Sequence, residues 1–114
     1  MSTSALKEAL KTLAEALPSR LSIRQALAFI YVAEAEHRGQ QITMSDLKEY
    51  FGDEGKSVAN TFEVFYDSKD RDPHCVGWVT QENDPSDRRK KFLRLTAEGH
   101  RVARMLNEQM ETAA

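Results

Sequence analysis

The stretch from Ile23 to His37 is apolar on nearly every side of the helix that it predicts, and it constrains the fold more than any other feature. Ser22 precedes it and Gln25 follows three residues later, which is the spacing of a capping box, while Gly39 stands where a helix commonly ends. A helix with so little polar surface has to be covered on more than one side. We therefore expect it to lie at the centre of a helical core.

Two more helices are predicted after a short link, with a glycine-containing turn between them. Thr43 is placed to cap a helix over Met44–Phe51, and the apolar spacing that follows predicts another over about Lys56–Ser68. A short helix, a tight turn and a second helix with a polar face are the parts of a helix-turn-helix.

Helices are also expected at both ends of the chain. Leucines at spacings of four, three and four residues predict a helix over about Thr3–Leu17, and Thr96 is placed to cap a last helix over Ala97 to about Met110. A narrow leucine seam is typical of helix pairing, within one chain or between two. The residues expected on the pairing faces are Leu6, Leu10, Leu13, Leu17, Val102, Leu106 and Met110.

A dense cluster of turn-forming residues, Asn83–Asp87, separates two short runs of strand-forming residues. The runs Val76–Gln81 and Lys91–Thr96 predict the two strands of a β-hairpin, with Arg94 on the opposite face from the two leucines beside it. The predicted fold class is therefore mainly α with a small β-hairpin: a winged helix-turn-helix flanked by terminal helices.

With 114 residues, the chain has room for one domain. We divide it into an N-terminal helix (1–20), a winged-helix core (21–96) and a C-terminal helix (97–114). The longest apolar run, Ala26–Ala33, is too short to span a membrane, and the first residues lack the pattern of a signal peptide. The single cysteine, Cys75, suits a reducing compartment. We expect a cytoplasmic protein.

The net charge of −2 conceals one cationic stretch. Residues 84–104 carry seven Lys and Arg side chains against three acidic ones, while the rest of the chain is acidic. A basic segment of this kind is a possible electrostatic contact for nucleic acid, although a solvated helix face has a similar composition.

Four motifs in this sequence resemble the MarR family of multiple-antibiotic-resistance regulators. They are Ile42–Leu47 at the start of a helix, Gly77–Val79 before the wing, Asp84–Arg89 with the D-R-R pattern of a wing tip, and Leu93–Gly99 with the L-T-x-x-G pattern. The sequence departs from the family pattern in being shorter and in having a longer loop before Gly77.

The resemblance implies double-stranded DNA as the partner, with the third helix in the major groove and the wing in the minor groove. It implies that Asp87 orients Arg89 and that Arg88 or Arg89 reaches the minor groove, while Lys90 and Lys91 neutralise phosphates. The candidate DNA-binding residues of the third helix are Lys56, Ser57, Asn60 and Thr61.

The resemblance also implies a homodimer built from the terminal helices, and the predicted function is that of a dimeric transcriptional repressor. The acidic balance and the single base of the third helix keep two alternatives open: a winged-helix module that binds a protein partner, and a nonspecific architectural or replication-linked DNA binder. Any small-molecule effector is unknown.

No pattern in the sequence predicts catalysis, a cofactor or a metal site. The motifs of hydrolases, phosphate-binding loops and metalloproteases are all missing from the sequence. Cys75 and His74 are adjacent and lack the spacing of zinc ligands, so we expect Cys75 to be a packed thiol.

Overall fold

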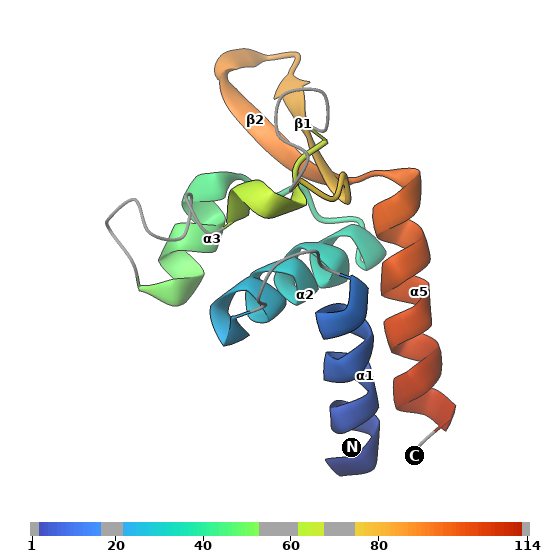
Figure 1. Ribbon diagram of the computed structural model, residues 1–114. Helices are drawn as coiled ribbons and strands as arrows, with labels where there is room; N and C mark the ends of the chain where they lie inside the picture. Colours follow the sequence, from blue (N-terminus) through green and yellow to red (C-terminus); the bar gives the residue numbers. More distant parts are fainter. Residues whose placement is uncertain (1–2, 17–21, 53–61, 68–74, 113–114) are drawn as a thin grey trace.

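The computed structural model describes residues 3–16, 22–52, 62–67 and 75–112 (Figure 1). Its elements are α1 (Thr3–Ala16), α2 (Ile23–His37), α3 (Met44–Phe51), the 3-10 helix η1 (Glu63–Phe65), β1 (Val79–Asp84), β2 (Asp87–Leu95) and α5 (Ala97–Thr112). The two strands pair as one antiparallel hairpin. This arrangement confirms the predicted class, mainly α with a small β-hairpin.

Helix α2 lies between the hairpin and the pair formed by α1 and α5 (Figure 1). Its Phe29 is fully buried and forms the centre of an aromatic cluster. The ring centroid of Phe29 lies 5.5 Å from that of Phe65 and 5.0 Å from that of Trp78. These contacts join α2 to η1 and to the segment that enters the hairpin, so one core supports all three elements.

One side of α2 is not covered by the described part of the chain. Ile23, Leu27 and Ile30 are 85%, 37% and 40% exposed, and their spacing puts them on one stripe. The expectation that α2 is covered on more than one side is therefore met only in part by the described residues.

The predicted caps at the starts of α2 and α3 are present. The Gln25 N–H donates to Ser22 Oγ at 3.0 Å, and the Ser22 N–H donates to Gln25 Oε1 at 2.9 Å. Thr43 and Asp46 form the same reciprocal pair at the start of α3. Each pair satisfies main-chain donors that the helix itself leaves unpaired.

Helix α2 ends where its glycine predicts. Gly39 has a φ of +70°, and its N–H donates to the Glu36 carbonyl while the Gln40 N–H donates to the Ala35 carbonyl. The left-handed backbone that this ending requires is easily adopted by glycine alone.

Helices α1 and α5 lie side by side and antiparallel, with both chain ends at the same end of the molecule (Figure 1). The face of α1 that is buried carries Ala5, Ala9 and Leu13, whereas Leu6 and Leu10 are 46% and 39% exposed. The predicted leucine seam is thus divided between a buried face, which holds Leu13, and an exposed face, which holds Leu6 and Leu10. Small alanines occupy the rest of the buried face, where α1 and α5 are in close contact. Leu17 lies outside the described residues.

The prediction that the third helix continues to about Ser68 is wrong. Phe62 is helical and Glu63–Phe65 form η1, but Tyr66 is extended and pairs with Val79. The carbonyls of residues 64–66 accept main-chain hydrogen bonds from residues 76–78 instead of continuing a helix to Ser68. A tertiary contact with the returning chain therefore ends the helix, and the predicted start at Lys56 lies outside the described residues.

Both strands are displaced toward the turn from their predicted positions. Strand β1 begins at Val79 rather than Val76, because the main chain of residues 76–78 is already bonded to residues 64–66. Strand β2 begins at Asp87 rather than Lys91, because the turn is confined to residues 85 and 86. The hairpin is therefore longer than the sequence predicts.

Candidate DNA-binding surface

The tip of the hairpin is shaped by a carboxylate that binds its own turn. Asp84 Oδ1 accepts hydrogen bonds from the Ser86 N–H at 2.8 Å and the Ser86 hydroxyl at 2.7 Å. Both bonds lower the pKa of Asp84, and the bond from the Ser86 N–H has the larger effect. The turn is therefore held by local contacts in which Asp84 is ionised at neutral pH.

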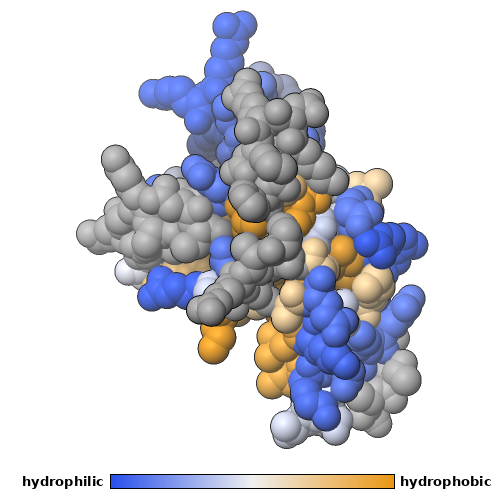
Figure 2. Space-filling model, in the orientation of Figure 1, coloured by the Kyte–Doolittle hydropathy of each residue, from blue (hydrophilic) through white to orange (hydrophobic). Residues whose placement is uncertain are grey.

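A register shift in the ladder produces a cationic bulge just after the turn. Asn83 pairs with Lys91 and Asp84 pairs with Asp87, so Arg88, Arg89 and Lys90 have no pairing partners on β1. We call these three residues the cationic bulge. All three are exposed, as is Lys91. Figure 2 shows hydrophilic side chains extending from the hairpin, away from the rest of the molecule.

Asp87, the residue just before the bulge, contacts Arg89. The Arg89 N–H donates to Asp87 Oδ1 at 3.0 Å, and Arg89 Nε lies 3.6 Å from the same oxygen. The Arg89 side chain nevertheless remains 93% exposed. The guanidinium is thus tethered at one side and open to solvent, an arrangement that leaves it able to contact an anion.

An open groove of about 560 Å³ lies between the bulge and the start of α3. Arg89, Lys90 and Lys91 line one side of it, while Asp46 and Asp84 also reach it. The surface of the groove is therefore mixed in charge, and the purely cationic part of the hairpin is the bulge.

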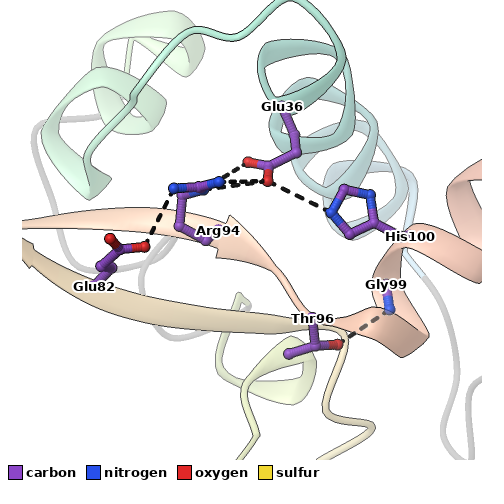
Figure 3. Close-up of polar contacts among 6 residues, drawn as sticks. All are labelled: Glu36, Glu82, Arg94, Thr96, Gly99 and His100. Atoms are coloured by element: carbon purple, nitrogen blue, oxygen red, sulfur yellow. Dashed lines mark hydrogen bonds and ion pairs between the residues drawn. The ribbon is translucent and has the colours of Figure 1, made fainter.

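The base of the hairpin contains an ion-pair cluster that the sequence analysis missed (Figure 3). Arg94 Nε and Nη2 donate to the two carboxylate oxygens of Glu36 at 2.9 and 3.0 Å, and Arg94 Nη1 donates to Glu82 at 3.2 Å. His100 Nε2 lies 3.5 Å from Glu36. The hydrogen bond to Glu36, followed by the charge of that carboxylate, raises the pKa of Arg94.

The junction between the hairpin and α5 explains the L-T-x-x-G motif. Thr96 Oγ1 donates to the Gly77 carbonyl at 2.6 Å and accepts from the Gly99 N–H at 3.1 Å, which confirms Thr96 as the cap of α5. The Thr96 N–H donates to the Trp78 carbonyl at 2.9 Å. One threonine thus joins the segment that enters the hairpin to the helix that leaves it.

The candidate residues of the third helix, Lys56, Ser57, Asn60 and Thr61, lie outside the described residues. The part of that segment that is described holds two fully buried rings, Phe62 and Phe65. Their burial anchors the end of the segment in the core beside Trp78.

The predicted dimerisation residues fall into two groups. Leu13, Val102 and Leu106 are buried within the protomer, where they belong to the core. Leu6 and Leu10 are exposed, and Figure 2 shows an apolar patch beside α1. Met110 is half-buried against the core, and Leu17 lies outside the described residues.

Within the described ranges, no group of three or more potential metal ligands is found. Cys75 is buried, and its thiol donates to the Glu63 carbonyl at 3.3 Å. None of the described helices combines the length and the apolar character that crossing a membrane requires.

No family model matches this sequence, and no curated protein matches it. Solved structures, however, match nearly the whole chain. MepR of S. aureus in complex with DNA has a TM-score of 0.65 and 17% identity, and the match covers 95% of this chain and 77% of that one.

Two further structures show the same similarity. The transcriptional regulator Tm0710 of Thermotoga maritima has a TM-score of 0.63 and 21% identity, with 95% of this chain and 66% of that one covered. MarR has a TM-score of 0.57 and 19% identity, with 95% and 71% covered. The chain thus has the winged helix-turn-helix fold of MarR and of the transcriptional regulator Tm0710, the fold that the motifs at residues 42–47 and 77–99 imply.

Proposed function

We propose that this chain is a sequence-specific regulator of transcription that binds double-stranded DNA and acts as a dimeric repressor. The observation that carries the proposal is the cationic bulge, Arg88–Lys90, which stands exposed at the tip of the hairpin. An exposed arginine on a narrow projection suits the minor groove, where the negative potential is greatest. The likeness in fold to MepR, whose structure was solved with DNA, supports this interpretation.

The charge distribution supports the hairpin tip, rather than its base, as the DNA contact. Arg94 and Arg101 are engaged by Glu36 and Glu98 respectively. The bulge has three cations against two nearby carboxylates, since Asp87 contacts Arg89 and the charge of Asp84 interacts with that of Lys90. Counterion release on DNA binding requires cations that are not already neutralised, so the bulge and the adjacent Lys91 are the residues that would neutralise phosphates.

The rest of the proposed interface is inferred from the likeness in fold. Lys56, Ser57, Asn60 and Thr61 would contact the major groove, with Asn60 suited to reading adenine. Leu6 and Leu10 would pair with a second protomer, because they are apolar, exposed and distant from the hairpin. A dimer bound across two half-sites would block access to the DNA between them, which is the simplest mode of repression.

The experiment is selection of bound sequences from a random duplex library, followed by titration of the selected site at several salt concentrations. We expect a pseudo-palindromic site with half-sites about 10–10.5 bp apart. Affinity should fall steeply and linearly with the logarithm of salt concentration. Salt-dependent binding without an enriched site would instead indicate an architectural DNA binder. Absence of DNA binding would contradict the proposal and favour a protein-interaction module.

A further inference from the structure

Arg94 connects three elements that are far apart in the sequence. It stands on β2, where it reaches Glu36 in the last turn of α2 and Glu82 on β1 (Figure 3). Glu36 also lies 3.5 Å from His100 in the first turn of α5. Both strands of the hairpin are therefore joined, through one guanidinium, to the body of the protein.

The contact with Glu36 has the geometry of a strong ion pair. Two nitrogens of the planar guanidinium face the two oxygens of one carboxylate, so the pair fixes orientation as well as distance. The Glu36 side chain is only 10% exposed, and a carboxylate so shielded from water is costly to leave without a cation. Arg94 is thus held firmly in one position.

The hairpin has other connections to the body, one of which is a hydrogen bond from Gln81 Nε2 on β1 to the Tyr66 hydroxyl at 3.3 Å, while two on β2 are made by the main chain. The Leu93 N–H donates to the Ile42 carbonyl at 2.8 Å, and Thr43 forms an isolated bridge with Phe92. Such main-chain contacts fix where β2 is attached but allow a two-stranded ribbon to twist and bend beyond them. Arg94 adds a side-chain connection that reaches β1 as well.

We propose that Arg94 and Glu36 form a clamp that sets the direction in which the hairpin leaves the body, and that Arg94 is a positioning residue for the cationic bulge rather than a DNA contact. Two carboxylates already engage its charge, and the side chain is 36% exposed, against 93% for Arg89. The statement about direction is independent of DNA. Its consequence for binding rests on the proposed function.

The direction of the hairpin is measured first, without DNA. Spin labels are attached to the cysteines of Ser86→Cys in the turn and Asn107→Cys on α5, in a Cys75→Ala background. The distance between the two labels is measured by pulsed electron paramagnetic resonance. We expect a narrow distance distribution in the otherwise unchanged protein. Arg94→Met should broaden or shift it, and Arg94→Lys, which keeps the charge but loses the planar fork, should have an intermediate effect.

Two further variants make this measurement decisive. Glu36→Gln/Arg94→Met removes both charges and therefore leaves no buried carboxylate without a cation, so it can be measured even if Arg94→Met fails to fold. It should broaden the distance distribution in the same way as Arg94→Met. Arg101→Met removes an arginine that is paired with Glu98 on α5, and it should leave the distribution unchanged. An unchanged distribution in the folded double variant would overturn the clamp.

A double-mutant cycle then tests the consequence for DNA. Arg94→Met should weaken binding about tenfold when the bulge is intact and change it little in an Arg88→Ala/Arg89→Ala background, because the clamp acts through the bulge. Equal losses in both backgrounds would show that Arg94 acts on DNA by another route and would overturn the positioning role. If no variant binds DNA, the proposed function fails, while the distance measurement still decides the clamp.

Discussion

Gly99 lies against the main-chain carbonyl of Trp78 so closely that a β-carbon at position 99 would overlap that oxygen. The two nearest atoms belong to the main chain of Trp78, whose carbonyl also accepts a hydrogen bond from the Thr96 N–H, and so they have little freedom to move away. We predict that Gly99→Ala lowers the free energy of unfolding by about 1–3 kcal/mol, although alanine is the better helix former.

Chemical denaturation monitored by circular dichroism measures this change. The matched control is Asn107→Ala, an exposed position on the same helix, which should alter stability by no more than about 0.5 kcal/mol. A Gly99→Ala protein as stable as the control would show that the start of α5 does not need its close approach to Trp78.

The cationic bulge should be required for DNA binding and dispensable for folding. Arg88→Ala/Arg89→Ala should weaken DNA binding and reduce the dependence of affinity on salt, because cations that displace counterions are lost. Stability should change by no more than about 0.5 kcal/mol, since both side chains are exposed. Fluorescence anisotropy at several salt concentrations measures the first effect, and denaturation measures the second.

The control for the bulge is Lys7→Ala/Arg104→Ala, which removes the same charge from exposed positions on the terminal helices. It should leave affinity nearly unchanged, because these helices extend away from the hairpin (Figure 1). Equal losses of affinity from both double variants would mean that net charge, and not the hairpin, determines binding.

Asn60 and Lys56, which lie outside the described residues, are predicted to act differently on DNA. Asn60→Ala should cost about 1–3 kcal/mol on the selected site and relax the preference at one base position. Lys56→Ala should weaken binding to all sequences alike. Titrations of the selected site and of random duplex distinguish the two. Identical effects on both duplexes would show that this segment contacts phosphates only.

The exposed leucines of α1 should hold the dimer together. Leu6→Glu/Leu10→Glu should convert a dimer into a monomer, because it places charge on an apolar surface that a second protomer would cover. Light scattering at micromolar concentration measures the mass. DNA affinity should fall at the same time, since each half would bind alone.

Ser4→Glu/Lys11→Glu is the control for this dimer prediction, because these exposed residues lie on the other side of α1. It should remain dimeric. A monomeric mass for the unaltered protein would contradict the proposed dimer directly.

Alkaline pH should destabilise the fold through Tyr66. Burial raises the pKa of Tyr66 to about 12, against an ordinary value of 10.0, while the hydrogen bond donated by Gln81 opposes the rise. Between these values the unfolded chain loses the phenolic proton and the folded chain retains it, so stability falls as pH rises from about 10 to about 12. Partial exposure limits the expected loss to about 1 kcal/mol.

Denaturation at pH 9, 10 and 11 measures this loss. Tyr66→Phe should reduce it, because the variant has no phenolic proton at this position. An unchanged pH dependence in Tyr66→Phe would rule out Tyr66 as its source.

The sequence determined the features that depend on neighbouring residues. The caps at Ser22 and Thr43 were predictable because a capping box is a contact over three residues, and the glycine at position 39 because only a few residues adopt its backbone conformation. The tip of the hairpin belongs to the same class, since Asp84 binds a residue two positions away. The exposed cations of the bulge follow directly from their place beside that turn.

Tertiary structure decided the features that depend on segments meeting in space. Residues 76–78 end the third helix and delay β1 because their main chain bonds to residues 64–66, which no local pattern shows. The leucine spacing predicts leucines on the inner face of α1, whereas this face belongs partly to Ala5 and Ala9 because α5 lies so close that it favours small side chains. Arg94 belongs by sequence to the basic stretch 84–104, yet its partner Glu36 stands 58 residues earlier in the chain. Sequence periodicity cannot predict an ion pair between residues so far apart in the chain, because only the fold brings the two side chains together.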